Sequence, residues 1–266
     1  MDLKLKGKRA LVTGGSKGIG RAIARQLSLE GVDVVIAARN LHDLEAAAQA
    51  LAAETGGNVT NLVVDTSDDA SVKQLVERTV AVLGGLEILV NAAAVPGGSQ
   101  TSPKLAEITN ALFWDDVDVK VMGYLRVARE AAPHMVAAGW GRIINISGLA
   151  ARQTGSIIGS IRNVAVAALT KNLADELGSA GINVTVVHPG LTRTERTAQS
   201  LAGMAARSGS TADEVEKRLS ANVSIGRLVD ASEVADIVTF LASPRSVAIN
   251  GDAIACGGGA RSSIHY

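Results

Sequence analysis

The sequence predicts a three-layer, doubly wound α/β fold built on a seven-stranded, mainly parallel sheet. Two observations carry this prediction: short β-branched runs alternate with helical stretches along the 266 residues, and a glycine-rich turn separates the first run from a helix. Strands that alternate with helices are joined by right-handed crossovers, which place them in a parallel sheet covered on both faces.

Seven segments are expected to be strands because each is short, aliphatic and bounded by turn or helix signals. Two strand cores, Leu62-Val63-Val64 and Ile88-Leu89-Val90, are continuously apolar, which indicates burial on both faces. In chain order the expected strands are Ala10–Thr13, Val32–Ala38, Val59–Asp65, Leu86–Asn91, Arg142–Ser147, Asn183–His188 and Asp252–Cys256.

The intervening helices are indicated by apolar residues four positions apart. Ile19, Ile23 and Leu27 form one such stripe, and a second stripe consists of Leu169, Leu173 and Leu177. Helix ends are expected where a glycine can take the left-handed conformation of a C-terminal cap, namely at Gly31, Gly84, Gly178 and Gly181.

The chain is expected to form a single domain, 1–266, without repeats or linkers. Residues Val95–Pro103 are expected to form a loop at the carboxyl edge of the sheet, and residues 191–222 a substrate-loop insertion after the sixth strand. Small residues in this insertion fit either a mobile lid or a disordered surface segment; they are Gly203, Ser208, Gly209 and Ser210.

Composition excludes several classes of function. Lysine and arginine total 26, aspartate and glutamate also 26, and no basic block exists, which argues against a nucleic-acid binder. No run of 18 apolar residues could span a membrane, and Met1–Arg9 lacks the apolar core of a signal peptide. A lone cysteine, Cys256, favours the reducing cytoplasm. His, Cys, Asp and Glu never cluster at ligand spacing, so no metal site is expected.

The turn Thr13–Gly20 has the spacing of a dinucleotide-binding loop between a strand and a helix. Gly14 suits the tight turn, Gly18 allows a pyrophosphate to approach the backbone, and Gly20 allows close contact between helix and strand. The free N–H groups at the start of the helix would face the phosphates. We therefore expect a nicotinamide dinucleotide as the cofactor.

The end of the second strand bears on the choice between NADP and NAD. An acidic residue there would hold the ribose hydroxyls, but the sequence has Arg39, which can grip a 2′-phosphate together with Lys17. This favours NADP over NAD, with a solvated loop cation as the other reading of Arg39. Asp65 and Thr66 are expected near the adenine amino group, and Asn91 at the central crevice.

In combination these motifs resemble the short-chain dehydrogenases/reductases, with their Rossmann fold, from about Leu5 to Gly259. The resemblance implies that Gly14, Ser16, Gly18 and Ile19 follow the pyrophosphate, that Asn91 and Ala93 approach the adenosine ribose, and that Pro189, Gly190, Thr192 and Thr194 surround the nicotinamide amide. It also implies a homotetramer or dimer paired through helices at 115–138 and 160–178. The matching pieces are Thr13–Gly20, Asp65, Leu89–Ala94, Ile143–Ser147, Leu169–Lys171, Pro189–Gly190 with Thr194, Ile225–Arg227 and Glu233–Ala235.

The family's catalytic Tyr-x-x-x-Lys is missing from this sequence. The chain has two tyrosines, Tyr124 and Tyr266; Ala128 stands four residues after the first, and the second is the last residue. Registration by Leu169-Thr170-Lys171 puts Gly159 at the family's Tyr position and Asn163 at its Lys position. Registration by the interval from the family's Ser puts Ile161 and Ala165 there instead.

Substitute catalytic residues are Ser147, Lys120 and Asn163. Ser147 stands one place before the family's Ser position, and Lys120 takes the position of the family's Asn. Lys120 is either a desolvated amine that acts as acid, base or Schiff-base nucleophile, or an ordinary surface lysine. Arg162 can orient an anion without acting as an acid, or face solvent. His188 is expected to be a satisfied strand-end histidine.

The resemblance implies an oxidoreductase that binds NADP(H) or NAD(H) and acts on a small carbonyl or alcohol. The missing Tyr and Lys require a non-standard proton path. Two alternatives stay open: a non-redox nucleotide-binding regulator or inactive partner subunit, and a lyase or isomerase in which Lys120 handles the proton.

Overall fold

The computed structural model describes residues 1–94 and 102–261 and contains a seven-stranded sheet in which every strand pair is parallel. The strand order is β3-β2-β1-β4-β5-β6-β9. This confirms the predicted fold class, and each strand overlaps its predicted segment. The strands are β1 (Arg9–Thr13), β2 (Asp33–Ala38), β3 (Val59–Val63), β4 (Ile88–Asn91), β5 (Gly141–Ile146), β6 (Ile182–Pro189) and β9 (Ala253–Cys256).

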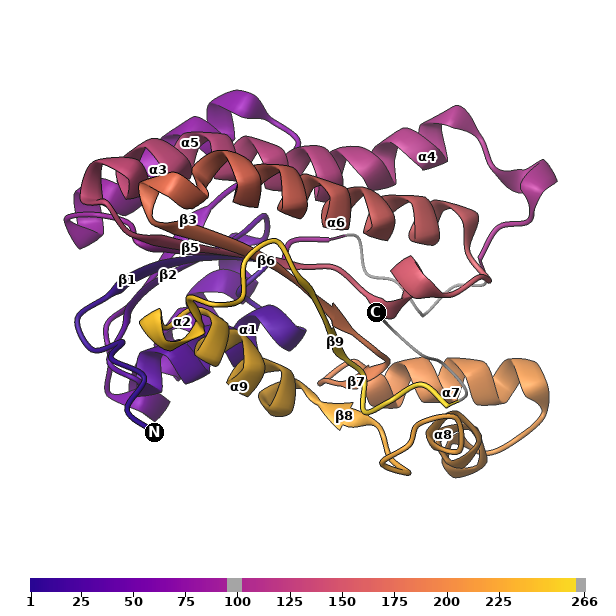
Figure 1. Cartoon of the computed structure of the whole chain (residues 1–266). Coiled ribbons are helices and arrows are strands. Elements are labelled where there is room, and N and C mark those ends of the chain that lie inside the picture. The colour runs from indigo at the N-terminus through magenta and orange to yellow at the C-terminus, as the bar shows by residue number, and fades with distance from the viewer. Residues whose placement is uncertain (95–101, 262–266) are drawn as a thin grey trace.

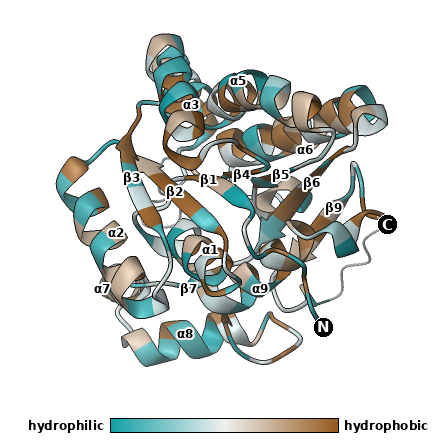
Figure 2. Ribbon diagram, turned by 90° about the vertical axis from the view of Figure 1, so that its left-hand side faces the viewer, coloured by the Kyte–Doolittle hydropathy of each residue, from teal (hydrophilic) through white to brown (hydrophobic). Residues whose placement is uncertain are grey.

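Helices cover the sheet on both faces (Figure 1). One layer contains α3 (Asp69–Leu83), α4 (Asn110–Val117), α5 (Gly123–Ala138) and α6 (Ile157–Leu177); the other contains α1 (Gly18–Leu29), α2 (Leu41–Thr55) and α9 (Ala231–Leu241). Each helix layer contains hydrophilic as well as hydrophobic residues (Figure 2). No helix of the described residues is long and apolar enough to cross a membrane.

Consecutive residues of the central strands enter two separate cores. Val12 and Val90 pack in the core beneath α1, α2 and α9, whereas Leu11 and Leu89 pack in the core beneath α3, α5 and α6. Both faces of these strands are therefore buried, which explains why their sequences are continuously apolar.

Three of the four glycines expected at helix ends take the left-handed conformation. Gly84 caps α3 with φ 75°, and Gly31 and Gly181 have φ values of 78° and 84°. Gly178 also ends α6 as expected, but the left-handed conformation is wrong there, because Gly178 is right-handed with φ −58°. A single 3₁₀ turn, Gly178–Ala180, follows α6 and ends at the left-handed Gly181.

The segment 191–222 is largely helical. It contains the short strand β7 (Thr192–Arg193), which pairs with β8 (Val229–Asp230), and the helices α7 (Thr197–Ser208) and α8 (Ala212–Ser220). Leu201, Ala205 and Val215 bury a small core between the two helices. Gly209 and Ser210, which suggested a lid or a disordered segment, form the turn between them. Most of the expected loop at 95–103 lies outside the described residues.

The sheet topology determines where a ligand can bind. The strand order runs outward in opposite directions from β1 and β4, so the crossovers on either side of this pair diverge. Divergence leaves a crevice at the carboxyl ends of the strands, where doubly wound sheets bind their ligands. Helices α7 and α8 lie at this edge (Figure 1).

Candidate active site

A cleft of about 940 Å³ opens at the carboxyl edge of the sheet. It brings together most of the residues expected at the site from distant parts of the chain. Those that line it are Gly14, Ser16, Lys17, Gly18, Ile19, Gly20, Arg39, Thr66, Ala93, Lys120, Ser147, Asn163, Pro189, Gly190, Thr192 and Thr194. Asp65, Asn91 and Gly159 do not line it.

The glycine-rich turn is shaped for close backbone contact. Gly14 has φ 69°, and a Cβ on it would stand 2.7 Å from the carbonyl carbon of Ala92. A Cβ on Gly20 would stand 2.3 Å from the carbonyl oxygen of Gly14. Any side chain at either position would therefore push the turn away from β4 or from α1.

The N-terminus of α1 already holds an anionic group of the protein itself. The Gly18 N–H donates to both carboxylate oxygens of Glu195, at 2.9 and 3.2 Å, and the Lys17 side chain makes no capping bond. A carboxylate occupies this position because free N–H groups at a helix start attract anions. The turn therefore fits a dinucleotide phosphate.

The adenosine end differs in detail from the sequence expectation. Arg39 is exposed at the cleft, and Lys17 forms an ion pair with Asp43. The Asp65 carboxylate accepts hydrogen bonds from Ser67 N–H and Oγ, which lowers the Asp65 pKa and fixes its own turn. Arg39, Lys17 and Arg196 are thus cations that line this end of the cleft.

Asn91 lies in the core beneath the cleft. Its side chain is fully buried and donates from Nδ2 to Asn145 Oδ1 at 3.0 Å, and Asn145 in turn donates to Thr170 Oγ1. This chain of hydrogen bonds joins β4, β5 and α6. In this structure Asn91 therefore links elements and is not exposed to a ligand.

The three proposed catalytic side chains meet at one point of the cleft. Lys120 Nζ donates to Ser147 O and to Asn163 Oδ1, each at 3.0 Å. The Ser147 hydroxyl donates to Asn163 as well, with both acceptor oxygens at 3.1 Å. Asn163 is buried, whereas Ile161 of the alternative registration is exposed. The amine is thus held between β5 and α6.

Burial makes the Lys120 amine less basic than an exposed lysine. Its side chain is enclosed, with 4% of the residue exposed, and burial is the main cause that lowers its pKa to about 7. The positive charge of Arg162 lowers the pKa further, and Asp116 opposes the shift. Near neutral pH the amine can therefore both give and take a proton.

A π turn places Lys120 in the cleft. Residues Asp118–Met122 form this turn between α4 and α5, and the Gly123 N–H bonds to Asp118 O, five residues earlier. Turns of this kind are rare and occur most often at functional sites. The extra residue lets Lys120 face the cleft while α5 continues on the sheet.

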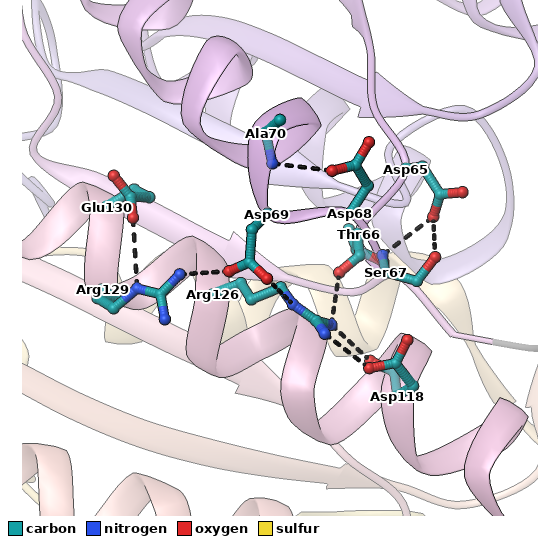
Figure 3. Close-up of polar contacts among 10 residues, drawn as sticks. All are labelled: Asp65, Thr66, Ser67, Asp68, Asp69, Ala70, Asp118, Arg126, Arg129 and Glu130. Carbon is teal, nitrogen blue, oxygen red and sulfur yellow. Dashed lines mark hydrogen bonds and ion pairs between the residues drawn. The ribbon is translucent and has the colours of Figure 1, made fainter.

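An ion-pair network fastens the π turn to the segment between β3 and α3 (Figure 3). Arg126 donates to the Asp118 carboxylate at 2.8 Å, to Thr66 O at 3.2 Å and to Asp69 at 3.3 Å. The Thr66 hydroxyl donates to Val119 O, next to Lys120. These contacts fix the backbone from which the Lys120 side chain projects.

The structure assigns no cleft position to a tyrosine among the described residues. Tyr124 is buried, its hydroxyl donates to Ile146 O at 2.8 Å, and burial raises its pKa. At Gly159 a Cβ would stand 2.8 Å from the Ser156 hydroxyl, which caps α6 by accepting from the Gly159 N–H. Tyr266 lies outside the described residues.

Two acidic residues of the site were missed by sequence reasoning. Asp116 forms an ion pair with Arg162 Nη1, and Glu195 binds the Gly18 N–H. Asp116 lies four residues before Lys120, a helical spacing that could have drawn attention to it. Nothing in the sequence around Glu195 indicates its contact with a turn 177 residues away.

The nicotinamide end of the expected site is formed by the end of β6. Pro189, Gly190, Thr192 and Thr194 line the cleft, and the Thr192 hydroxyl donates to Gly190 O at 3.1 Å. His188 is buried and its Nδ1 accepts from the Gly148 N–H at 3.4 Å. Its place is that of a structural histidine at a strand end.

Comparisons with known proteins identify close relatives. The family described as enoyl-(acyl carrier protein) reductase matches residues 14–261. A 3-oxoacyl-(acyl-carrier-protein) reductase of Aquifex aeolicus is 30% identical over 262 residues, covering 97% of this chain and 99% of the relative. A putative ketoacyl reductase of Streptomyces coelicolor is 34% identical over 254 residues, covering 94% and 95%. The crystal structure of L-sorbose reductase from Gluconobacter frateurii, complexed with NADPH and L-sorbose, matches with a TM-score of 0.93 at 28% identity, covering 99% of this chain and 100% of that one.

Proposed function

Because this chain belongs to the short-chain dehydrogenase/reductase family, we propose that it is an atypical member that reduces a small carbonyl compound with NADPH and takes the proton from Lys120. The observation that carries this proposal is the Lys120 amine, held in the cleft at 3.0 Å from both Ser147 O and Asn163 Oδ1.

The cofactor would be held by groups already in place. The glycine turn and the start of α1 would bind its pyrophosphate, and Arg39 with Lys17 would bind the 2′-phosphate that distinguishes NADP from NAD. The end of β6, Pro189–Thr194, would surround the nicotinamide. Similar solved structures that contain NADPH support this assignment. When bound, the cofactor supplies a hydride to the substrate carbon.

Lys120 would complete the reduction. A lysine ammonium has three N–H donors, of which Ser147 O and Asn163 Oδ1 take two, so the third can donate to a substrate oxygen. As hydride reaches the carbonyl carbon, the Nζ proton moves to the carbonyl oxygen and leaves an alcohol and a neutral amine. Solvent then returns a proton to the amine, whose pKa of about 7 allows this at neutral pH.

The pair Lys120 and Asn163 exchanges the residue types expected at two family positions. The resemblance places Asn where Lys120 stands and Lys where Asn163 stands. The two side chains are hydrogen-bonded, so the exchange keeps one amine and one amide in contact. Asn163 then orients the amine and supplies no charge of its own.

The first test is cofactor binding, measured by fluorescence while NADPH or NADH is titrated into the protein. The second test is turnover of a panel of carbonyl, enone and alcohol compounds. Lys120→Met should leave NADPH affinity within about twofold and lower kcat by about 10²- to 10⁴-fold. In the wild-type protein kcat should fall as pH rises above about 7, because the protonated amine is the donor.

Lys171→Met is the matched control, since Lys171 is exposed on α6 and pairs with Asp175. Equal turnover by Lys120→Met and wild type would remove Lys120 from the mechanism. Tight NADPH binding without turnover of any compound would favour the non-redox regulator instead.

We also propose that α4, α5 and α6 form the contact between subunits of a homo-oligomer. Large apolar side chains are exposed on these helices, with Trp114 at 61%, Val164 at 51% and Ile161 at 46%. Apolar groups that gather on one layer are typical of protein interfaces. The single cysteine keeps the cytoplasm as the proposed location.

A further inference from the structure

A second cation lies beside Lys120 in the cleft. Arg162 and Lys120 both line it, and Asn163, the residue after Arg162, accepts the Lys120 hydrogen bond. The Arg162 charge is close enough to affect the Lys120 amine. Two adjacent cations in a partly enclosed site repel each other unless anions balance them.

The Arg162 guanidinium is only partly satisfied. Its side chain is 13% exposed, and Nη1 forms an ion pair with Asp116. Nε is buried and has no hydrogen-bond partner among the described residues, and Nη2 takes part in no hydrogen bond or ion pair there. A buried charged donor without an acceptor is costly, so the guanidinium favours an added acceptor, and Nη2 is the unpaired nitrogen that a ligand in the cleft can reach.

The charges around this guanidinium favour an anion. Among the described lining residues the two carboxylates, Asp43 and Glu195, lie at the cofactor end, where Asp43 pairs with Lys17 and Glu195 binds Gly18. Near the amine the cations are Lys120 and Arg162, and Asp116 balances one of them. With the amine protonated, this end of the cleft has an excess of one positive charge.

We propose that Arg162 is a specificity-determining residue that selects carbonyl substrates carrying an anionic oxyacid group, a carboxylate in the first instance. This inference rests on the proposed function. The guanidinium keeps its charge at any working pH, and Nη2 carries two N–H donors that can bind a carboxylate oxygen in the cleft. An oxyanion held there would place the rest of the substrate beside Lys120, with its carbonyl oxygen facing the amine.

The anion would also assist the proton donor. A negative charge next to Arg162 and Lys120 offsets their repulsion and favours the ammonium form of Lys120. Substrates with the anionic group should therefore be reduced at a higher pH than neutral analogues. Recognition and proton donation would then depend on the same pair of side chains.

Matched substrate pairs test the proposal in the NADPH-loaded protein. The first pairs are acetoacetate with methyl acetoacetate and 2-oxobutyrate with its methyl ester; dihydroxyacetone phosphate with dihydroxyacetone tests phosphate as the oxyanion. We expect the anionic member of at least one pair to have a kcat/KM about 10- to 100-fold higher.

Arg162→Gln should remove that preference by raising KM for the anionic member about 10- to 100-fold more than KM for its neutral partner. Arg162→Lys should restore part of it, because it keeps the charge and loses the fork. Asp116→Asn frees Nη1 and should tighten anion binding. The control is Arg129→Gln, which removes one exposed cation that pairs with Asp69 and Glu130.

Equal kcat/KM values for the neutral and the anionic member of every pair would overturn the proposal. A preference for the anion that Arg162→Gln leaves intact would overturn it too. If no compound is reduced, the proposed function fails, and calorimetry with malonate and inorganic phosphate decides this inference separately. Binding to the wild type that Arg162→Gln abolishes supports the anion site. No binding of either ion overturns it.

Discussion

Replacing Lys120 with methionine is expected to stabilise the folded protein while it removes the proton donor. Burial and the charge of Arg162 lower the Lys120 pKa from 10.5 to about 7. At about 1.36 kcal/mol for each pKa unit, this difference corresponds to about 5 kcal/mol of destabilisation at pH values below 7. Methionine keeps the length of the side chain without the charge.

Part of this gain is lost with the hydrogen bonds. Asn163 Oδ1 keeps an available donor in the Ser147 hydroxyl, so Ser147 O is the acceptor left without one. Ser147 is partly buried at the cleft, so its unpaired carbonyl costs at most about 1–3 kcal/mol. The expected net increase in the free energy of unfolding is therefore about 2–4 kcal/mol at pH 6.

The pH dependence distinguishes this cause from a general packing effect. Between about 7 and 10.5 the unfolded chain binds the Lys120 proton and the folded chain does not, so wild-type stability rises with pH in this range. The variant lacks this contribution. Its advantage should shrink by about 2.5 kcal/mol between pH 6 and pH 9.

Urea unfolding followed by circular dichroism at pH 6, 7.5 and 9 measures these differences for wild type, Lys120→Met and the exposed control Lys171→Met. An advantage of the same size at pH 6 and pH 9 would refute the lowered pKa. A variant less stable than wild type at every pH would refute the cost assigned to the buried charge.

Three further changes test other parts of the site. Glu195→Gln should tighten NADPH binding about 3- to 10-fold, because a carboxylate no longer competes with the pyrophosphate for the Gly18 N–H; unchanged affinity would contradict this contact. Arg39→Gln should weaken NADPH binding about 10- to 100-fold and NADH binding less than about twofold, measured by fluorescence titration, whereas equal losses would reject the 2′-phosphate assignment. Val164→Asp should shift the mass measured by light scattering toward the monomer, and an unchanged mass would exclude this face of α6 from the subunit contact.

The sheet and the shape of the glycine-rich turn could be predicted because their signals are local. Continuous apolar runs mark strands buried on both faces, and the spacing from Gly14 to Gly20 follows from steric contacts within one turn. Segment 191–222 was harder to predict. Its small residues occupy a helix, a cap and a turn, while the core that orders them combines Leu201, Ala205 and Val215 across two helices.

At the candidate site, sequence reasoning could not predict the contacts between residues that lie far apart in the chain. The sequence indicated Lys120 and Asn163 as substitutes for family residues, yet their mutual hydrogen bond depends on a π turn that no local pattern predicts. Asn91 was expected at the crevice because it ends a strand. Pairing with Asn145 on the next strand turns its side chain into the core instead.

The π turn at Asp118–Met122 changes the direction in which the side chains of α5 point relative to those of α4. One added residue rotates everything beyond it by about 100°. The side of α5 that packs on the sheet and buries Tyr124 and Val127 is therefore not a continuation of the side of α4 that contacts Arg162. Substitutions in α4 can therefore change the surroundings of Arg162 while the packing of α5 on the sheet stays unchanged.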